Sequence, residues 1–199
     1  MAAIHLPRAI RIGGGVLDEL PAALGQFGLT RPLIVTDGWI ATSGVLQRVL
    51  DILARAGIAA RTFADAVPDP TVSCVEAACA FLREGAHDCV IGLGGGSPID
   101  TAKIVAVKGL RDVAVRDLKA PHQEDAPGLP IIAIPTTAGT GAEVGRAALL
   151  TALRVANGSF AWTFCSSAAL RSFVLLGTLK RTRCSVVGRC SRAMGGLRM

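Results

Sequence analysis

The last 56 residues of this 199-residue chain contain no acidic residue and no histidine. All 15 Asp and Glu lie in residues 1–143, together with 12 Lys and Arg, so the net charge of that part is −3. Residues 144–199 hold nine Lys and Arg, which gives a net charge of +9. The formal charge of +6 therefore comes from the tail alone, and it does not indicate an acidic partner for the rest of the chain.

A long apolar run and a secretory leader are also missing. The longest uncharged stretch of the tail, Val155–Leu170, has 16 residues and includes Asn157 and Gly158, so it is shorter than the roughly 18–20 apolar residues that span a bilayer. The N-terminal sequence MAAIHLPRAIRIGGG has no basic start followed by an apolar segment, as a signal peptide would have. We therefore expect a cytoplasmic protein that does not bind membranes.

Cysteine and histidine patterns for a metal or a nucleophile are absent too. The six cysteines form no CxxC pair, and none has a histidine at zinc-finger spacing: Cys74, Cys79, Cys89, Cys165, Cys184 and Cys190. In a reducing compartment they are most simply free thiols that fill space. His5, His87 and His122 are far apart, and the spacing supports no Ser-His-Asp or Cys-His arrangement. We therefore predict no catalytic and no metal-ligating residue.

What the chain does have is apolar content. Hydrophobic residues make up 51% of it and charged residues 18%, which excludes a disordered chain. The composition also differs from that of collagen, coiled coils and disulfide-rich miniproteins. The length suffices for one domain with a core, or for one domain and a tail.

Short apolar segments alternate with amphipathic segments through residues 1–144. The predicted strands are Leu33–Thr36, Ile58–Phe63, Cys89–Leu93 and Ile131–Ile134. The predicted helices are Val45–Ala56, which Gly57 ends, a helix that Thr71 caps and Gly85 closes, and one that begins near Pro98. This alternation predicts an α/β fold with a doubly wound, Rossmann-like parallel sheet.

Three segments with small or polar residues follow predicted strands. They are Asp37-Gly38, the glycine loop Gly94–Ser97 and the threonine loop Thr136–Gly141. Because the carboxyl ends of parallel strands meet at one edge of a sheet, we expect the three segments to gather there, where ligands bind in such folds.

The glycine loop favours phosphate binding. Glycines let a ligand approach the main chain, and a helix that begins near Pro98 offers free N–H groups and the positive end of its dipole. The Ser97 hydroxyl adds a donor. The alternative is a tight strand-to-helix turn without a ligand, and the segment matches neither G-x-G-x-x-G nor the P-loop pattern.

Acidic and hydroxyl side chains near these segments have two interpretations each. Asp37 suits the two hydroxyls of an adenosine ribose and would repel a 2′-phosphate, or it forms a turn with Gly38. The threonines could donate to a phosphate or a ribose, or form a polar connection. Asp100 and Lys103 are three positions apart on the helix after the glycine loop, and the simplest interpretation is a solvated ion pair.

Two strings together carry a family resemblance. GGGSPIDTAK at Gly94–Lys103 and IPTTAGTGAEV at Ile134–Val144 closely resemble the iron-containing alcohol dehydrogenase family. LIVTDG at Leu33–Gly38 and DPT at Asp69–Thr71 also fit, so the resemblance covers about residues 4–144 and ends at Gly145.

The resemblance implies oxidation of a small alcohol to an aldehyde or ketone with NAD, and family members are often homo-oligomers. It implies that Asp37 binds the adenosine ribose, that Gly95, Gly96 and Ser97 hold the pyrophosphate, and that Asp69 and the threonines line the other half of the cofactor. The predicted cofactor-binding residues are Asp37, Asp69, Gly95, Gly96, Ser97, Asp100, Thr136, Thr137 and Thr140. In the family Fe²⁺, or sometimes Zn²⁺, polarises the substrate oxygen.

Residues 145–199 depart from the family pattern. Family members hold their metal with one Asp and three His in a second, all-helical domain, whereas this tail has neither residue type. We therefore predict a nucleotide-binding domain at 1–144 that lacks the second domain, a basic tail at 145–199, and a truncated, inactive fragment. One hypothesis is that the tail is an out-of-frame translation that starts near codon 145. The alternatives are a nucleotide-binding module without catalysis, or a tail that binds nucleic acid or membranes, although we expect neither of these partners.

Overall fold

Six parallel strands form the central sheet of the computed structural model, which describes residues 7–111, 113–118, 128–145, 147–152, 161–166 and 173–178. Their order across the sheet is β1-β8-β5-β4-β2-β3. The strands are β1 (Ala9–Gly13), β2 (Pro32–Val35), β3 (Arg61–Phe63), β4 (Cys89–Gly94), β5 (Ile131–Pro135) and β8 (Phe173–Thr178). The predicted parallel α/β fold is confirmed.

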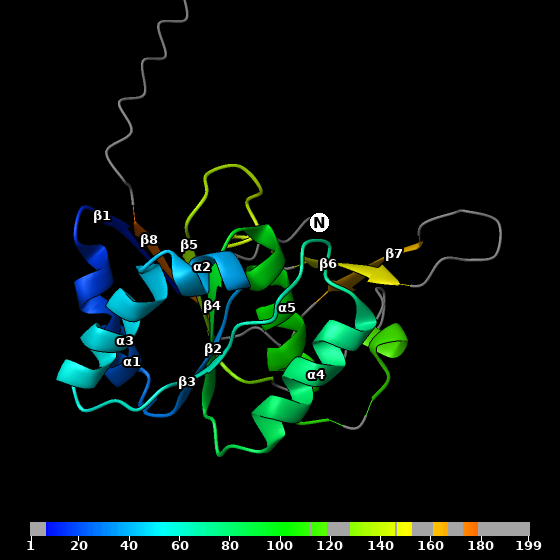
Figure 1. Cartoon of the computed structure of the whole chain (residues 1–199), viewed down its shortest axis with the longest axis horizontal. Coiled ribbons are helices and arrows are strands. Elements are labelled where there is room, and N and C mark those ends of the chain that lie inside the picture. The colour runs from blue at the N-terminus through cyan, green and yellow to red at the C-terminus, as the bar shows by residue number, and fades with distance from the viewer. Residues whose placement is uncertain are drawn as a thin grey trace, which may run out of the picture.

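Helices cover both faces of this sheet, as Figure 1 shows. They are α1 (Leu20–Gln26), α2 (Gly38–Thr42), α3 (Val45–Arg55), α4 (Val72–Arg83) and α5 (Gly96–Lys108), with 3₁₀ turns η1 (Val16–Glu19) and η2 (Val115–Leu118). Alternate residues of the strands face opposite layers: Leu33 and Val35 pack in a core with α4 and α5, and Ile34 packs in a second core with α1 and α3. The sheet is therefore doubly wound.

The cap at Thr71 and the helix end at Gly57 are found where the sequence predicts them. Thr71 caps α4, since its hydroxyl accepts a hydrogen bond from the Cys74 amide at 3.2 Å. Gly57 ends α3 in a left-handed conformation with φ of 73°. The Ile58 amide donates to the Leu53 carbonyl, so Ile58 belongs to the helix end and β3 begins only at Arg61. The predicted strand Ile58–Phe63 is too long for this reason.

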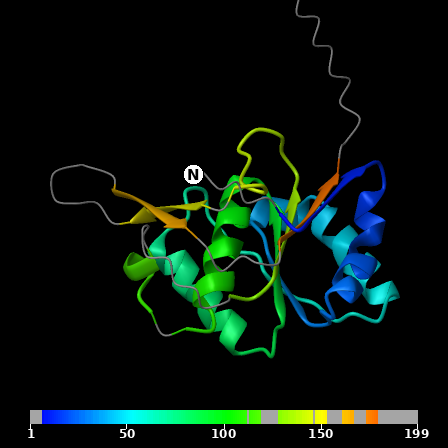
Figure 2. The same ribbon diagram turned by 180° about the vertical axis from the view of Figure 1, so that it is seen from behind.

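Three strands lie in the part of the chain for which the sequence predicted no regular structure. β6 (Ala147–Ala152) pairs antiparallel with β7 (Ala161–Ser166), and Figure 2 shows this pair projecting beside α5. β8 lies between β1 and β5 in the central sheet. Of these three strands, β8 is thus part of the central sheet, and β6 and β7 form a separate two-stranded sheet. Among the described residues, no helix is both long and apolar enough to cross a membrane.

Candidate functional site

The strand order reverses between β2 and β4. These strands are neighbours, but the chain continues from β2 to β3 on one side and from β4 to β5 on the other. The two strand ends are joined by the buried Thr36 hydroxyl, which donates to the Leu93 carbonyl at 2.8 Å. Sheets of this kind open a ligand-binding crevice at such a reversal, beyond the carboxyl ends of the strands.

The glycine loop runs directly from β4 into α5 and leaves no room for a side chain at its first residue. Gly94 has φ of 142°, which L-residues with a side chain rarely adopt. A Cβ atom at Gly94 would lie 2.8 Å from Pro98 Cγ and 3.5 Å from Asp37 Oδ2. Glycine is therefore required where β4 turns into α5, which begins at Gly96 rather than near Pro98.

The threonine loop lies against the glycine loop. The Thr136 amide donates to the Gly94 carbonyl at 2.9 Å. A Cβ atom at Gly95 would lie 3.4 Å from Thr137 Oγ1, and one at Gly96 would lie 3.0 Å from Thr140 Cγ2. The structure therefore brings Gly95, Gly96, Thr137 and Thr140 together, as predicted, and both threonines are exposed.

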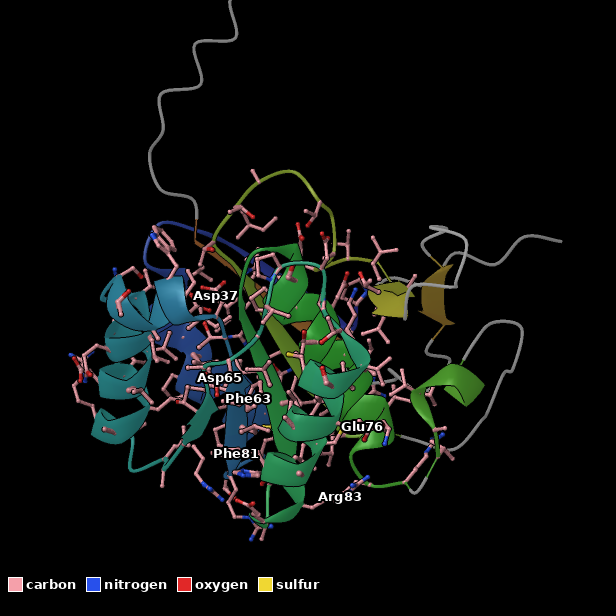
Figure 3. All side chains as sticks on the ribbon, turned by 45° about the vertical axis from the view of Figure 1, so that its right-hand side comes forward. Asp37, Phe63, Asp65, Glu76, Phe81 and Arg83 are labelled. Carbon is pink, nitrogen blue, oxygen red and sulfur yellow. The ribbon has the colours of Figure 1, made fainter. Side chains whose placement is uncertain are left out.

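Asp37 follows the end of β2 and precedes α2. Its Oδ1 atom accepts a hydrogen bond from the Ile40 amide at 2.8 Å and so caps α2. Its Oδ2 atom is the oxygen near Gly94. Figure 3 shows Asp37 at the same end of the sheet as the loop after β5. The carboxylate is half-buried, so it forms the local turn and still has one oxygen directed at the glycine loop.

Asp69 is placed differently from the other predicted residues. It is exposed in the turn before α4 and has φ of 49°, a conformation that Asp and Asn tolerate better than most residues. Asp37, Thr137 and Thr140, in contrast, each lie within 4 Å of a Cβ atom placed on a residue of the glycine loop.

Asp100 and Lys103 are buried, so the prediction of a solvated ion pair is wrong. Asp100 is 7% exposed and Lys103 is 1% exposed. Lys103 Nζ lies 3.2 Å from Asp100 Oδ1, and burial raises the pKa of Asp100 while the Lys103 ammonium acts to lower it. Both side chains are covered because β6 packs on α5. The sequence did not predict β6.

The sequence analysis assigned no role to Thr36 and did not predict the contact that Lys103 makes with β6. The Thr36 hydroxyl joins β2 to β4, and Lys103 donates to the Ala147 carbonyl at 2.7 Å. A polar residue at the very end of an apolar strand was the available signal for Thr36. For Lys103 no local signal existed, because its partner is 44 positions away in the sequence.

Comparison with known proteins agrees with this arrangement. The model of the iron-containing alcohol dehydrogenase family matches residues 7–170. The chain belongs to the iron-containing alcohol dehydrogenase family. The match runs past residue 144, where we expected the resemblance to end, and it includes β6 and β7.

Curated relatives of the family are longer than this chain. Long-chain-alcohol dehydrogenase 1 of Geobacillus thermodenitrificans (strain NG80-2) is 37% identical over 154 residues, which are 76% of this chain and 39% of that protein. NAD-dependent methanol dehydrogenase of Bacillus methanolicus is 32% identical over 151 residues, 76% of this chain and 40% of that protein. The chain thus spans about 40% of the length of these relatives.

Solved structures of the family share the fold. The NADH-dependent butanol dehydrogenase A of Thermotoga maritima superposes with a TM-score of 0.79 at 27% identity, over 89% of this chain and 44% of that chain. The sulfoacetaldehyde reductase of Bifidobacterium kashiwanohense, solved in complex with NAD⁺, superposes with a TM-score of 0.77 at 29% identity, over 89% and 46%.

The described residues provide no metal centre for this family's iron. Within them, no three side chains of His, Cys, Asp or Glu come close enough to hold a metal ion. The three cysteines whose surroundings are described, Cys74, Cys79 and Cys89, are buried free thiols. Burial raises the pKa of Cys79 to about 11, which disfavours the thiolate that binds metals.

Proposed function

We propose that this chain binds NAD(H) at the reversal of strand order, beside Asp37, the glycine loop and the threonine loop, as the nucleotide-binding part of an NAD-dependent alcohol dehydrogenase. The observation that carries the proposal is the close packing of Asp37, the glycine loop and the threonine loop at the reversal of strand order. The names of relatives support the cofactor, since they include an NAD-dependent methanol dehydrogenase and a reductase solved with NAD⁺.

The pyrophosphate lies on the first turn of α5 in this proposal. The amides of Gly95, Gly96 and Ser97 precede or begin a helix of 13 residues, whose N-terminus favours negative charge. The missing Cβ atoms at Gly95 and Gly96 leave the main chain accessible between the threonine side chains. A larger residue at Gly95 or Gly96 would meet Thr137 or Thr140 and cover these amides.

Asp37 selects NAD over NADP in this proposal. Its Oδ2 atom is directed toward the glycine loop, where a ribose next to the pyrophosphate would lie. A carboxylate accepts hydrogen bonds from both ribose hydroxyls and repels a 2′-phosphate. The capping bond to Ile40 holds the carboxylate in place for this contact.

The nicotinamide half extends toward the hydroxyls of Thr137 and Thr140, with Asp69 as a further contact. When bound, NAD supplies the acceptor for a hydride from an alcohol, which becomes an aldehyde or ketone. The metal of the family needs a donor set that the described residues do not bring together. We therefore expect residues 1–199 to bind the dinucleotide without oxidising alcohols by themselves.

Calorimetric titration of the full chain with NADH tests the proposal. Binding of NADH but not of NADPH supports it, and no heat with either dinucleotide overturns it. Gly96→Ala places a Cβ atom against Thr140 and at the diphosphate, so we expect about tenfold weaker binding. Gly25→Ala is the matched control, because no atom lies within 4 Å of its added Cβ. NADH formation from a short primary alcohol with added Fe²⁺ would contradict the expected lack of catalysis.

A further inference from the structure

Two charged side chains of α5 bind the main chain of β6. Lys103 Nζ donates to the Ala147 carbonyl at 2.7 Å, and Asp100 Oδ2 accepts from the Leu149 amide at 3.1 Å. Asp100 Oδ1 lies 3.2 Å from the same ammonium. The pair thus holds the start of β6 through main-chain atoms, so the attachment does not depend on the side chains at positions 147 and 149, provided that position 149 is not proline.

β6 is the strand into which the threonine loop leads. At its start, the loop is bound to the glycine loop by the hydrogen bond from Thr136 to Gly94. At its end, the amides of Val144 and Gly145 donate to the Gly141 carbonyl, and this turn leads directly into β6. A Cβ atom at Gly145 would lie 4.0 Å from Lys103 Nζ. Both ends of the threonine loop are therefore attached to the unit of β4, the glycine loop and α5.

The burial of the pair indicates that its role concerns this attachment. A buried ion pair contributes little net stability compared with apolar side chains of similar size, because both charges lose their water. The hydrogen bonds to Ala147 and from Leu149, and the one within the pair, make up for part of that loss. Asp100 Oδ1 is paired with Lys103 of α5 and Oδ2 accepts from Leu149 of β6, so both carboxylate oxygens have protein partners, although the sequence predicted a contact with the cofactor.

We propose that Asp100 and Lys103 are positioning residues that hold the end of the threonine loop against the glycine loop, and that Asp100 acts on the dinucleotide through β6 rather than by touching it. The part that concerns the dinucleotide rests on the proposed function. The attachment of the threonine loop is independent of the proposed function, and amide hydrogen exchange measures it separately.

Amide hydrogen exchange and NADH titration of the full chain test the proposal together. In Lys103→Met and Asp100→Asn we expect faster exchange at Leu149 and in the threonine loop, and about tenfold weaker NADH binding. Lys103→Met loses the donor to Ala147, and Asp100→Asn loses the charge that strengthens the hydrogen bond from Leu149. The double variant removes both charges at once, so it leaves no unpaired buried charge if a single variant fails to fold. Lys103→Arg restores a donor and should recover both properties in part.

Lys108→Met is the matched control. Lys108 is a buried lysine of the same helix, but its ammonium pairs with Glu76 of α4 at 2.8 Å and not with β6. We expect this variant to leave the exchange of the threonine loop and the NADH affinity unchanged. Equal effects of Lys108→Met and Lys103→Met would overturn the proposal, as would unchanged exchange at Leu149 in all Asp100 and Lys103 variants.

Other outcomes separate the two proposals. Weaker NADH binding in Asp100→Asn with normal exchange would mean that Asp100 touches the dinucleotide, which overturns the positioning role and keeps the proposed function. If the unmodified chain does not bind NADH, the proposed function fails, and the exchange data alone decide whether the pair holds the loop.

Discussion

The carboxylate of Asp37 and the main chain of Gly94 meet across the reversal of strand order: Asp37 Oδ2 lies 3.5 Å from the position of a Cβ atom at Gly94. The two residues come from the ends of neighbouring strands, β2 and β4. Asp37 also begins α2, so the same residue fixes a helix and faces the glycine loop. This relationship makes the roles of Asp37 in folding and in binding separable by mutation.

Asp37→Asn removes the charge and keeps the helix cap, since Asn and Asp cap helices about equally well. We expect stability within about 0.5 kcal/mol of the unmodified chain. The ratio of NADPH to NADH affinity should rise about tenfold, because the repulsion of a 2′-phosphate is lost. Calorimetry with both dinucleotides measures the ratio. Asp51→Asn changes the net charge equally at an exposed position on α3, and the same rise there would refute the role of Asp37.

Gly94→Ala should destabilise the fold by roughly 1–3 kcal/mol. Its Cβ atom would lie 2.8 Å from Pro98 Cγ, and φ of 142° is unfavourable for alanine. Urea unfolding, followed by circular dichroism, measures the loss. Gly25→Ala in α1 introduces the same methyl group into open space, so it should be neutral or stabilising by up to about 1 kcal/mol. A Gly94→Ala protein as stable as Gly25→Ala would show that the loop relaxes freely.

The sequence predicts the strands that carry the site because their ends are marked locally. Apolar runs stop at Asp37, at the glycine loop and at Pro135, and the parallel topology brings those ends together. No comparable turn signal distinguishes the end of β8 in the sequence. β8 lies between two other strands, so its residues need no apolar and polar alternation, and its uncharged run FVLLGT does not distinguish a strand from other buried segments.

β6 escaped prediction for a different reason. It is held by hydrogen bonds from Asp100 and Lys103 to its main chain, and such bonds leave no pattern in its own sequence. The spacing of Asp100 and Lys103 is the same for an exposed and a buried pair, so burial is decided by β6 and not by the helix. The predicted site residues Gly95, Gly96, Thr137 and Thr140 needed only local signals, and these four lie together in the structure.

Glu76→Gln should lower stability by about 1–3 kcal/mol. The Lys108 ammonium of α5 is buried, and Glu76 Oε2 of α4 lies 2.8 Å from it. Glu76 is labelled in Figure 3. The variant leaves a buried charge without its carboxylate. Combining Glu76→Gln with Lys108→Met removes that charge, so urea unfolding should show the double variant to be more stable than Glu76→Gln alone. A double variant with the summed loss of both single variants would contradict this coupling.

Asp88 should make the fold sensitive to acid. Burial acts to raise the pKa of Asp88, but hydrogen bonds from the Thr30 amide and hydroxyl and from the Arg31 amide outweigh burial, so the pKa lies below its ordinary value. A carboxyl group whose pKa is lower in the folded state stabilises that state above the unfolded pKa. We therefore expect this contribution to be lost as the pH falls from about 5 to 2.

Asp88→Asn removes the titrating group and leaves one of the backbone donors facing an amide. We expect a loss of roughly 1 kcal/mol or less at pH 7, because the group is partly screened by solvent, and a flatter fall in stability below pH 5 than in the unmodified chain. Urea unfolding at several pH values gives both curves. Asp51→Asn, at an exposed carboxylate that accepts from the Gln47 side chain, should follow the unmodified chain. If stability falls equally with pH in Asp88→Asn and in the unmodified chain, the acid sensitivity arises from other groups. A group whose pKa is the same in the folded and unfolded states does not make stability depend on pH.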